Sequence, residues 1–339
     1  MPAAPKIFLD GTPLSGPPGG IRRFAEELFK ALPAQWPEAE FALLSDQQEP
    51  KPQGWRKRWW SLGLPAALRE QKANLFHGVD FAVPYIPVCP TIMTVHDLSP
   101  WTLPDSQNQR VRERAGWLLR LRVPTLIHTP SSNVRQELIE HFDWPEDRVF
   151  AIPLAAAPHL RPHKSNPTQL PYILSVATLE HRKNLPILLQ ACEILWNEGL
   201  DFDLLLAGQT REGFTLPPNK RTHCLGYVDE AALPSYFSNA LCTVYPSLYE
   251  GFGLPILEAM QCGSPVLASD IPVLRETGAD AALYAPPNEP NAWAAALKIL
   301  LENEAEREQR RQLGLTRAAE FSWAKTANSM KTLYERCLG

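Results

Sequence analysis

Short apolar runs alternate along this chain with longer segments in which apolar residues recur at every third or fourth position. After the run at Lys6–Asp10, for example, Phe24, Leu28 and Leu32 recur at the helical period. Further runs of strand length follow at Phe41–Leu44, Thr91–Val95, Thr125–His128 and Arg148–Ile152, with a helix predicted at 132–141. Because strands that alternate with helices pair in parallel, this half is predicted to form an α/β domain around a parallel sheet.

The pattern stops in the proline-rich stretch from Ala155 to Pro171 and then starts again. Strands are predicted at Tyr172–Val176, Phe202–Ala207, Ala240–Pro246 and Pro265–Ala268, and helices at 185–196, at 230–239 and from about 289 to the end. The sequence therefore predicts two Rossmann-like domains, 1–160 and 161–322, whose parallel sheets face a central cleft. A last helix, 323–339, is expected to pack back on the first domain.

Composition argues against a nucleic-acid-binding, membrane-spanning or disulfide-rich protein. A chain of 339 residues suits two domains, and its net charge of −4 gives no reason to expect a nucleic acid partner. The start of the chain lacks the pattern of a signal peptide, and no apolar run approaches the ~18 residues of a membrane span. The six cysteines show no C-x-x-C spacing, so we expect reduced thiols and a cytoplasmic protein, peripheral at the inner face of the membrane if it contacts lipid.

A glycine-rich turn that leads into a helix lies at Leu248–Met260. Pro255 suits the first helical position, and Gly251 and Gly253 let a phosphate approach the backbone beside the positive end of the helix. The sequence therefore predicts an anion site at this turn.

Two carboxylates, Glu250 and Glu258, flank that turn. A carboxylate beside an anion site suits a ligand that carries hydroxyl groups on both sides of a diphosphate. In the alternative interpretation, Glu258 lies in the first helical turn and only complements the helix dipole.

Two adjacent cations follow the first strand of the second half. Arg182 and Lys183 lie in Glu180–Asn184, between that strand and its helix, where a fork-shaped guanidinium and an ammonium can neutralise a diphosphate. An arginine–lysine pair is common on surfaces, so the pair indicates a site only together with the glycine turn.

The first half offers two further candidates. Gly19 and Gly20 precede its first helix and are followed by Arg22, which favours a loop that faces an anionic ligand. His96 and Asp97 follow a buried strand, at the end where open α/β sheets bind ligands. The alternative is a structural hydrogen bond between His96 and Asp97.

Two stretches combine aromatic residues with cations. Residues 54–63 hold three tryptophans and three cations, and residues 110–122 read as an amphipathic helix with five arginines. Both stretches suit peripheral contact with an anionic membrane. The alternative for 54–63 is that its tryptophans cover a cleft, and the alternative for 110–122 is a solvated helix face. A third pattern, Asp201 and Asp203, has the spacing of a metal-binding pair, but it precedes a strand, at the wrong end of the sheet for a ligand.

Taken in order, four segments resemble the donor half of a retaining glycosyltransferase of family four, with the GT-B fold. They are Val176–Asn184, Leu225–Asp229, Tyr249–Glu258, which matches the Glu-x7-Glu motif of that family, and Ala268–Glu276. The first half matches the family more loosely, through Gly19-Gly20-Ile21 and His96-Asp97.

The resemblance implies a role for each matching residue. Glu258 would bind the ribose hydroxyls, Glu250 would contact the transferred sugar, and Arg182 and Lys183 would stabilise the departing diphosphate. The remaining implied contacts to the donor come from Gly251, Phe252, Gly253, Leu254, Gly19 and Gly20, with His96, Asp97 and Arg22 on the acceptor side. No metal or other cofactor is implied, because the cations and the helix dipole supply the positive charge.

The sequence departs from the family pattern at two places. Ala177-Thr178 replaces an arginine and a glycine, and His181 replaces a proline. The first departure resembles a mannosyltransferase subgroup, so mannose is the favoured sugar. The predicted function is transfer of a hexose from a nucleotide-diphosphate sugar to a saccharide or lipid-linked acceptor. A catalytically silent nucleotide-sugar-binding subunit and a nucleotide-sugar epimerase remain as alternatives.

Overall fold

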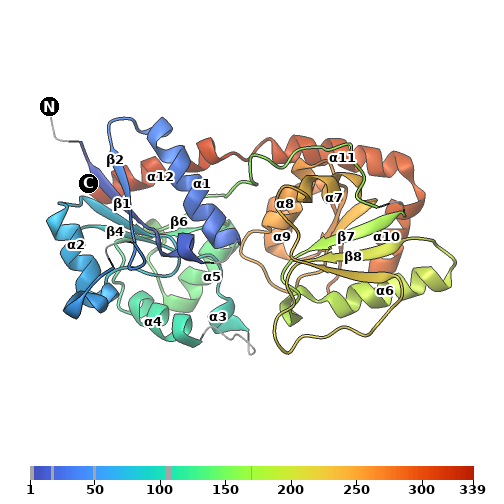
Figure 1. Cartoon of the computed structure of the whole chain (residues 1–339), viewed down its shortest axis with the longest axis horizontal. Helices are drawn as coiled ribbons and strands as arrows, with labels where there is room; N and C mark the ends of the chain where they lie inside the picture. The colour runs from blue at the N-terminus through green and yellow to red at the C-terminus, as the bar shows by residue number, and fades with distance from the viewer. Residues whose placement is uncertain (1–3, 17–18, 49–50, 104–108, 169) are drawn as a thin grey trace. The chain divides into compact units, whose positions relative to one another are not determined.

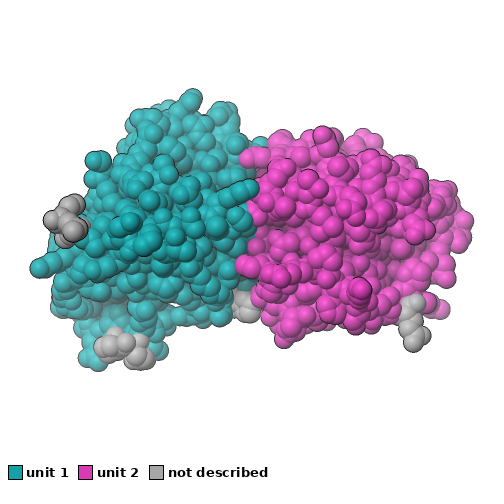
Figure 2. All heavy atoms as spheres, turned by 90° about the horizontal axis from the view of Figure 1, so that it is seen from above, with its two compact units in different colours: residues 1–155, 322–339 teal, residues 156–321 magenta. Residues whose placement is uncertain are grey.

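The computed structural model describes residues 4–16, 19–48, 51–103, 109–168 and 170–339 of the chain. The chain forms two compact units, coloured separately in Figure 2. Unit 1 comprises residues 1–155 and 322–339, and unit 2 comprises residues 156–321. Each unit has a six-stranded sheet, and every strand pairing in both sheets is parallel. The predicted α/β class is therefore confirmed.

The sheet of unit 1 has the strand order β2-β1-β3-β4-β5-β6. Its strands are β1 Lys6–Asp10, β2 Glu40–Leu44, β3 Leu75–Gly78, β4 Thr91–Thr94, β5 Leu126–Thr129 and β6 Val149–Ala151. Its helices are α1 Gly20–Gln35, α2 Leu64–Glu70, α3 Ser99–Thr102, α4 Gln109–Arg120, α5 Ser132–Phe142 and α12 Trp323–Leu338. The predicted apolar face of α1 is buried at Phe24, Leu28 and Leu32.

Unit 2 has the strand order β12-β11-β10-β7-β8-β9. Its strands are β7 Tyr172–Val176, β8 Asp203–Ala207, β9 Thr222–Gly226, β10 Cys242–Tyr245, β11 Val266–Ser269 and β12 Ala282–Ala285. Its helices are α6 Leu185–Asn197, α7 Leu233–Asn239, α8 Leu254–Gln261, α9 Pro272–Gly278, α10 Pro290–Glu302 and α11 Glu304–Ala318. Figure 1 shows α6 and α8 on opposite faces of this sheet. The strands between them are buried on both faces, as near-continuous apolar runs predict.

Three strands are missing from the prediction, each for its own reason. β3 has only four residues and includes the buried His77. β9 lies at the edge of its sheet and is largely exposed, so its sequence has little apolar character. β12 carries alanine at both ends, a residue that is depleted in strands.

The C-terminal helix α12 packs against α1 and belongs to unit 1. Ser322 caps its start by accepting a hydrogen bond from the Lys325 amide. The Thr326 hydroxyl donates to the Pro153 carbonyl, and the Tyr334 hydroxyl lies 2.8 Å from His77 Nδ1 in the core. The chain therefore enters unit 2 at residue 156 and returns to unit 1 at residue 322.

In the tryptophan-rich stretch 54–63, Trp59 does not take part in the membrane-facing surface that one interpretation predicts. This side chain is 8% exposed and packs in an apolar core cluster with Phe8, Leu64 and Phe76. Trp55 is 56% exposed, and Trp60 is partly buried. Trp59 begins the short helix Trp59–Gly63, and its burial comes from packing against side chains of β1, β3 and α2.

Candidate functional site

A buried lysine lies at the carboxyl end of β7. The short helix η5 (His181–Lys183) follows that strand and brings Lys183 toward β10. Lys183 is 6% exposed, and its Nζ lies 2.8 Å from the Tyr245 hydroxyl and 2.5 Å from Glu250 Oε1. The same ammonium lies 5.0 Å from the centre of the Tyr245 ring. Lys183 and Glu250 are 67 residues apart in the sequence, so the fold brings two predicted site residues into direct contact.

Arg182 joins Glu250 from the other side. Its Nη1 lies 3.4 Å from Glu250 Oε2 and donates to the Tyr249 carbonyl at 3.0 Å. Glu180 holds the same guanidinium at 3.1 Å and also pairs with Arg211. Three cations and two carboxylates therefore form one continuous network with an excess of positive charge, which suits an anionic ligand.

The pKa values within this network follow from burial and charge. Burial alone would raise the pKa of the Glu250 carboxyl, but Lys183 and Arg182 hold that pKa below its usual value. Burial lowers the pKa of Lys183, against the opposing effect of Glu250. Each oxygen of Glu250 contacts a cation, so this carboxylate fixes the positions of both Lys183 and Arg182.

The glycine turn leads into α8 as predicted, with a small shift of the helix start. Leu254 is the first helical residue, Pro255 follows it, and Gly253 is the N-cap with φ of 89°. A side chain at Gly253 would need this left-handed conformation and would place Cβ 2.7 Å from Leu274 Cδ2. The glycine is therefore required by the backbone and by packing, in addition to any close approach of a phosphate.

The other predicted residues of the turn form its packed base. Phe252 is buried, its carbonyl accepts a hydrogen bond from the Thr277 hydroxyl, and its ring contacts Phe321 at 5.9 Å. Gly251 precedes it at the buried end of the turn. The turn is thus held rigid while the first amides of α8, which have no partner within a helix, lie at its end.

Glu258 is the fifth residue of α8, one position further along the helix than predicted. The helix has no acidic residue in its first turn, so the alternative in which Glu258 complements the dipole from that turn is wrong. Glu258 is 5% exposed and lies close enough to Cys262 to raise the pKa of that thiol, after the larger effect of burial.

His96 and Asp97 lie after β4 in unit 1, but they are not bonded to each other. The His96 ring lies 2.8 Å from the Val79 carbonyl through Nε2. Asp97 Oδ1 accepts hydrogen bonds from the amide and the hydroxyl of Ser99, at the start of α3. The alternative of a structural histidine–aspartate pair is therefore wrong, because each side chain has its own partner.

The loop before α1 keeps its predicted place at the start of the helix. Gly20 is the first residue of α1, and Gly19 is an extended N-cap that accepts from the Arg23 amide. Arg22 pairs with Glu26 at 2.9 Å and donates to the Gly16 carbonyl. In this structure Arg22 therefore stabilises its own helix and loop.

Two members of the network in unit 2 are absent from the sequence prediction. Tyr245 is the last residue of β10, and Arg211 follows β8 by four positions. A polar residue at the carboxyl end of a parallel strand was the available signal for Tyr245. No pattern in the sequence marks Arg211, because its contact with Glu180 depends on the pairing of β7 with β8.

The acidic pair at Asp201 and Asp203 lies at the amino end of β8. Asp201 pairs with Arg221 at 2.6 Å, and Asp203 pairs with His223 at 3.0 Å. Within the described part of the chain, no group of three or more His, Cys, Asp or Glu side chains could hold a metal ion.

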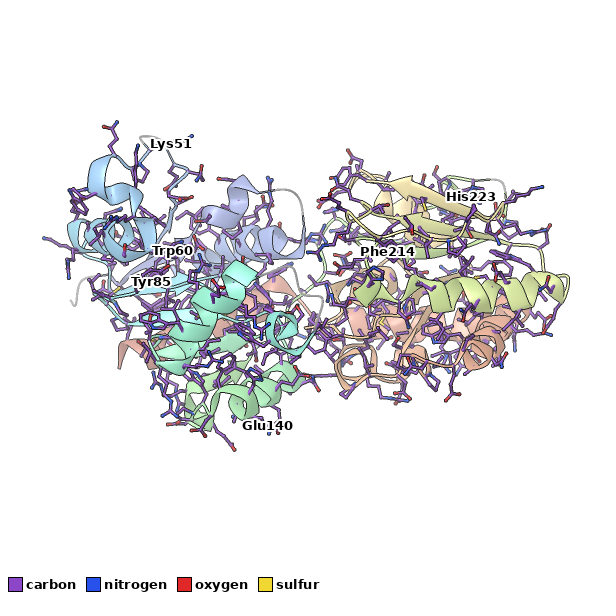
Figure 3. All side chains as sticks on the ribbon, turned by 90° about the horizontal axis from the view of Figure 1, so that it is seen from below. Lys51, Trp60, Tyr85, Glu140, Phe214 and His223 are labelled. Atoms are coloured by element: carbon purple, nitrogen blue, oxygen red, sulfur yellow. The ribbon has the colours of Figure 1, made fainter. Side chains whose placement is uncertain are left out.

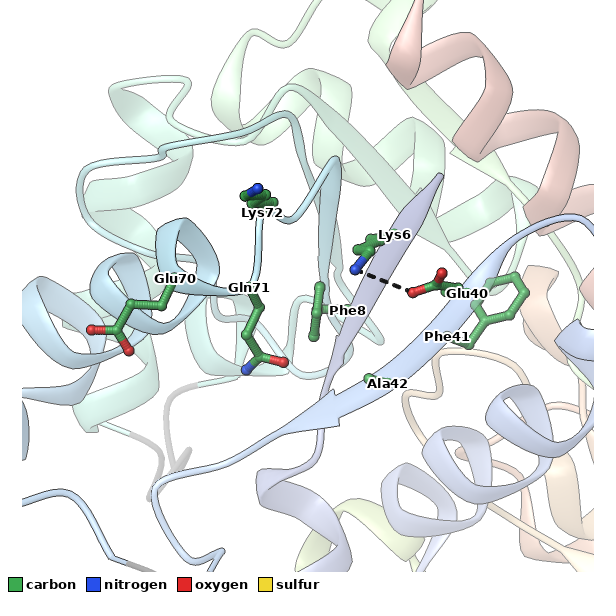
Figure 4. A pocket seen from close by; sticks show the side chains of 8 residues that line it. All are labelled: Lys6, Phe8, Glu40, Phe41, Ala42, Glu70, Gln71 and Lys72. Carbon is green, nitrogen blue, oxygen red and sulfur yellow. Dashed lines mark ion pairs between the residues drawn. The ribbon is translucent and has the colours of Figure 1, made fainter. Parts of the chain in front are cut away.

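A surface hollow of about 440 Å³ lies elsewhere in unit 1 (Figure 4). It opens beside the amino ends of β1 and β2, where Lys6 Nζ lies 3.4 Å from Glu40 Oε2. Its lining comprises Lys6, Phe8, Glu40, Phe41, Ala42, Glu70, Gln71 and Lys72. Since ligands of open α/β sheets bind at the carboxyl ends of the strands, this hollow is not the candidate site.

Comparisons with known proteins show that the chain is a glycosyltransferase of the GT-B class. The model for Glycosyl transferases group 1 matches residues 158–316, and the model for Glycosyltransferase Family 4 matches residues 18–156. The O-antigen chain mannosyltransferase B of Escherichia coli is 35% identical over 301 residues, which cover 79% of this chain and 76% of that protein. The O-antigen chain mannosyltransferase RfbU of Salmonella typhimurium strain LT2 is 29% identical over 219 residues, 61% and 59% of the two chains. The chain belongs to the family-four glycosyltransferases.

Solved structures share the fold. The sucrose-phosphate synthase of Thermosynechococcus elongatus superposes with a TM-score of 0.76 at 20% identity, covering 98% of both chains. Anabaena Alr3699/HepE, solved in complex with UDP-glucose, superposes with a TM-score of 0.73 at 18% identity, covering 97% of this chain and 99% of that chain. The GT-B fold predicted from the sequence is thereby confirmed.

Proposed function

We propose that this glycosyltransferase moves a hexose, with mannose favoured, from a nucleotide-diphosphate sugar to a saccharide or lipid-linked acceptor. The observation that carries the proposal is the contact of Lys183 and Arg182 with Glu250 beside the start of α8. The name of the Escherichia coli relative, an O-antigen chain mannosyltransferase, supports mannose and a saccharide acceptor. The complex of Anabaena Alr3699/HepE with UDP-glucose supports a nucleotide-sugar donor.

The residues of the network each have a chemical task in this proposal. Lys183, Arg182 and the first amides of α8 stabilise the negative charge that develops on the departing diphosphate. Glu250 holds both cations in place before the donor binds and contacts the transferred sugar. Glu258 binds the ribose hydroxyls, and His96 acts on the acceptor side. The sugar is transferred with retention of its anomeric configuration.

The reaction is proposed to need no metal ion, since the fixed cations supply the charge that a divalent ion would bring. Excess chelator should therefore leave turnover unchanged. Loss of activity with EDTA, restored by added Mg²⁺ or Mn²⁺, would contradict this part of the proposal.

A screen of donors tests the function directly. The melting temperature of the purified chain is measured with GDP, UDP, ADP and their sugars, because only a ligand that binds the folded state raises it. The donor that stabilises most is then incubated with octyl glycosides, and the product is identified by mass spectrometry and its anomer by NMR. Stabilisation without turnover would indicate the silent binding subunit, and a changed sugar without transfer would indicate the epimerase.

The acceptor side includes a surface of unit 1 suited to anionic lipid, which we call the α4 surface. It consists of residues 54–63, the segment Tyr85–Ile86 and α4 with Leu121. The Tyr85 amide donates to the Trp60 carbonyl, and the Tyr85 ring contacts Trp117 at 6.0 Å. Figure 3 shows Trp60 and Tyr85 near each other in unit 1. The two basic stretches recognised in the sequence therefore lie on one surface.

Large apolar side chains are exposed on the α4 surface beside its cations. The exposed fraction is 67% for Ile86, 59% for Leu121, 56% for Trp55 and 49% for Trp117. The side chain of Arg110 lies outside the described part of α4, but Arg112 and Arg120 are exposed. Aromatic rings at the interface with cations over anionic headgroups are the pattern of peripheral membrane contact. No helix in the described residues is long and apolar enough to cross a membrane.

Co-sedimentation with vesicles tests this contact. The chain is mixed with phosphatidylglycerol-containing and pure phosphatidylcholine vesicles at low and high salt. We expect binding to the anionic vesicles alone, weakened by salt and reduced at least about 10-fold by the double substitution Trp117→Ala and Arg112→Ala. The control is Arg221→Ala in unit 2. Equal binding by all variants, or none by the unchanged chain, would exclude the α4 surface.

A further inference from the structure

Asp80 lies directly beyond β3, in a turn whose backbone is tightly constrained. Gly78 is packed so closely that a Cβ there would lie 1.4 Å from the Ala82 carbonyl oxygen. Phe81, the next residue after Asp80, has φ of 50° and donates its amide to the Thr94 carbonyl of β4. The turn therefore presents Asp80 in a fixed position at the carboxyl end of the sheet, the end where ligands of such sheets bind.

The same turn determines which nitrogen of the His96 ring carries the proton. A carbonyl only accepts, so His96 Nε2 carries the proton that it donates to Val79, the residue before Asp80. The other ring nitrogen, Nδ1, keeps its lone pair in the neutral ring. Phe24 and Phe81 meet the imidazole nearly edge to face, at 5.3 Å and 6.3 Å, and hold its plane.

Asp80 and Arg114 have hydrogen-bonding capacity that the fold does not use. Among the described residues the Asp80 carboxylate has no hydrogen bond or ion pair, and Arg114 Nε is buried without a partner. Both side chains are partly buried. Burial raises the pKa of Asp80, with His96 and Arg114 close enough to oppose this effect. Burial outweighs these two opposing charges, so the ionised carboxylate destabilises the folded protein at neutral pH.

We propose that Asp80, flanked by His96 and Arg114, binds hydroxyl groups of the acceptor saccharide. A sugar hydroxyl donates to a carboxylate and accepts from a guanidinium N–H, so one polyhydroxyl ligand satisfies both groups. The unpaired negative charge disfavours a diphosphate, whereas the anion-binding network lies in unit 2. This cluster therefore suits the neutral acceptor saccharide and not the diphosphate of the donor. The inference rests on the proposed function.

The substitution Asp80→Asn tests the role, since it keeps the shape and removes the charge. We expect KM for the acceptor to rise about 10–100-fold, the effect of losing a hydrogen bond to a charged group. KM for the donor should stay within about twofold. The melting temperature at pH 7 should stay equal or rise, because a raised carboxyl pKa means that ionised Asp80 opposes folding above that pKa. The matched control is Asp147→Asn, an exposed carboxylate of unit 1.

The acceptor probes are octyl glycosides of mannose, glucose, galactose and N-acetylglucosamine, used with the donor that the unchanged chain accepts. Loss of donor affinity in Asp80→Asn, or an unchanged acceptor KM, overturns the proposal while the transferase function stands. Saturation-transfer NMR detects binding of the same glycosides to the nucleotide-bound chain. If none of them contacts the unchanged chain, the proposal is also overturned. Failure of the proposed function is distinct, because it appears as absence of donor turnover before any variant is compared.

Discussion

Lys183 is a buried cation that is held by one carboxylate and one phenol. Its partners Glu250 and Tyr245 come from the strand and turn on the other side of the β7–β10 pairing. The sequence predicted Lys183 at the diphosphate and Glu250 at the transferred sugar, and it gave no role to Tyr245. It did not predict that each carboxylate oxygen of Glu250 contacts a cation, because this depends on the distance between two loops that are 67 residues apart.

Substitution of Lys183 tests its catalytic role. Lys183→Ala should lower turnover by about 10²–10³, the effect of removing a preorganised charge that stabilises a transition state. It also leaves Glu250 buried without its nearest cation, so stability is measured by thermal melting alongside steady-state kinetics. The double variant Lys183→Met and Glu250→Gln removes both charges and should fold but remain inactive. Near-normal turnover in either variant would remove Lys183 from the mechanism.

Tyr245 is predicted to position Lys183. Tyr245→Phe removes the hydroxyl that accepts from Lys183 Nζ and should lower turnover about 5-fold, in line with the ~1 kcal/mol typical of one hydrogen bond. The comparison is Tyr172→Phe, which removes a hydroxyl that donates to the Tyr236 carbonyl in the same unit. Both variants should lose similar stability by urea unfolding, but only Tyr245→Phe should lose turnover. An equal effect of the two on kcat would make the role purely structural.

At the scale of elements, α12 is tied to the sheet of unit 1 by a buried chain of hydrogen bonds. The Ile152 carbonyl only accepts, so His128 Nε2 carries a proton and Nδ1 accepts from the Thr94 hydroxyl. The Thr94 oxygen in turn accepts from His77 Nε2, and His77 Nδ1 accepts from the Tyr334 hydroxyl of α12. Every group is satisfied only while both imidazoles are neutral.

This chain predicts a dependence of stability on pH. Burial lowers the pKa of His128 to about 4 and that of His77 well below its usual value. The stability that each gives is present above the unfolded pKa near 6.5 and is lost as pH falls toward the folded pKa. For His128 the loss between pH 7 and pH 5 is ~2 kcal/mol. Asp10, whose pKa burial raises to about 6, acts in the opposite sense, so a variant is needed to isolate His128.

The measurement compares urea unfolding of the unchanged chain and His128→Gln at pH 7 and pH 5. The change in unfolding free energy between the two pH values should differ by ~2 kcal/mol between the proteins, with the variant less sensitive to acid. Identical pH dependence would show that His128 is not held neutral by the fold.

At the scale of the whole molecule, the chain passes from unit 1 into unit 2 and then returns to unit 1. Unit 1 is completed by α12, which is separated from the rest of that unit by all of unit 2. The cation network lies in unit 2, and the Asp80 cluster lies in unit 1. That the two sheets face a common cleft, as the sequence predicts, stays a prediction.

Removal of α12 should act on one unit. A chain that ends at Phe321 exposes the α12-facing side of α1 and leaves His77 without its Tyr334 partner, so unit 1 should unfold at a lower temperature than unit 2. Differential scanning calorimetry should show two transitions, and the preferred nucleoside diphosphate should raise only the upper one. A single transition at the original temperature would contradict this dependence on α12.

The sequence by itself determined the local features of this protein. Apolar periodicity gave the alternation of strands and helices, and Gly253 and Pro255 marked the start of α8, because helix starts and strand faces depend on neighbouring residues. The family-four motifs pointed to the donor half without any knowledge of distance. Short or exposed strands such as β3 and β9 were missed, since they carry little apolar pattern.

Only the tertiary structure decided which distant residues meet. Strand order and the conformation of each turn determine three such contacts. They are the pairing of Lys183 with Glu250, the hydrogen bond between His77 and Tyr334 across 257 positions, and the place of Asp80 beside His96. Trp59 was assigned to the core for the same reason, against the surface role that its basic neighbours suggested. Contacts of this kind follow from the packing of the whole unit, which no local pattern encodes.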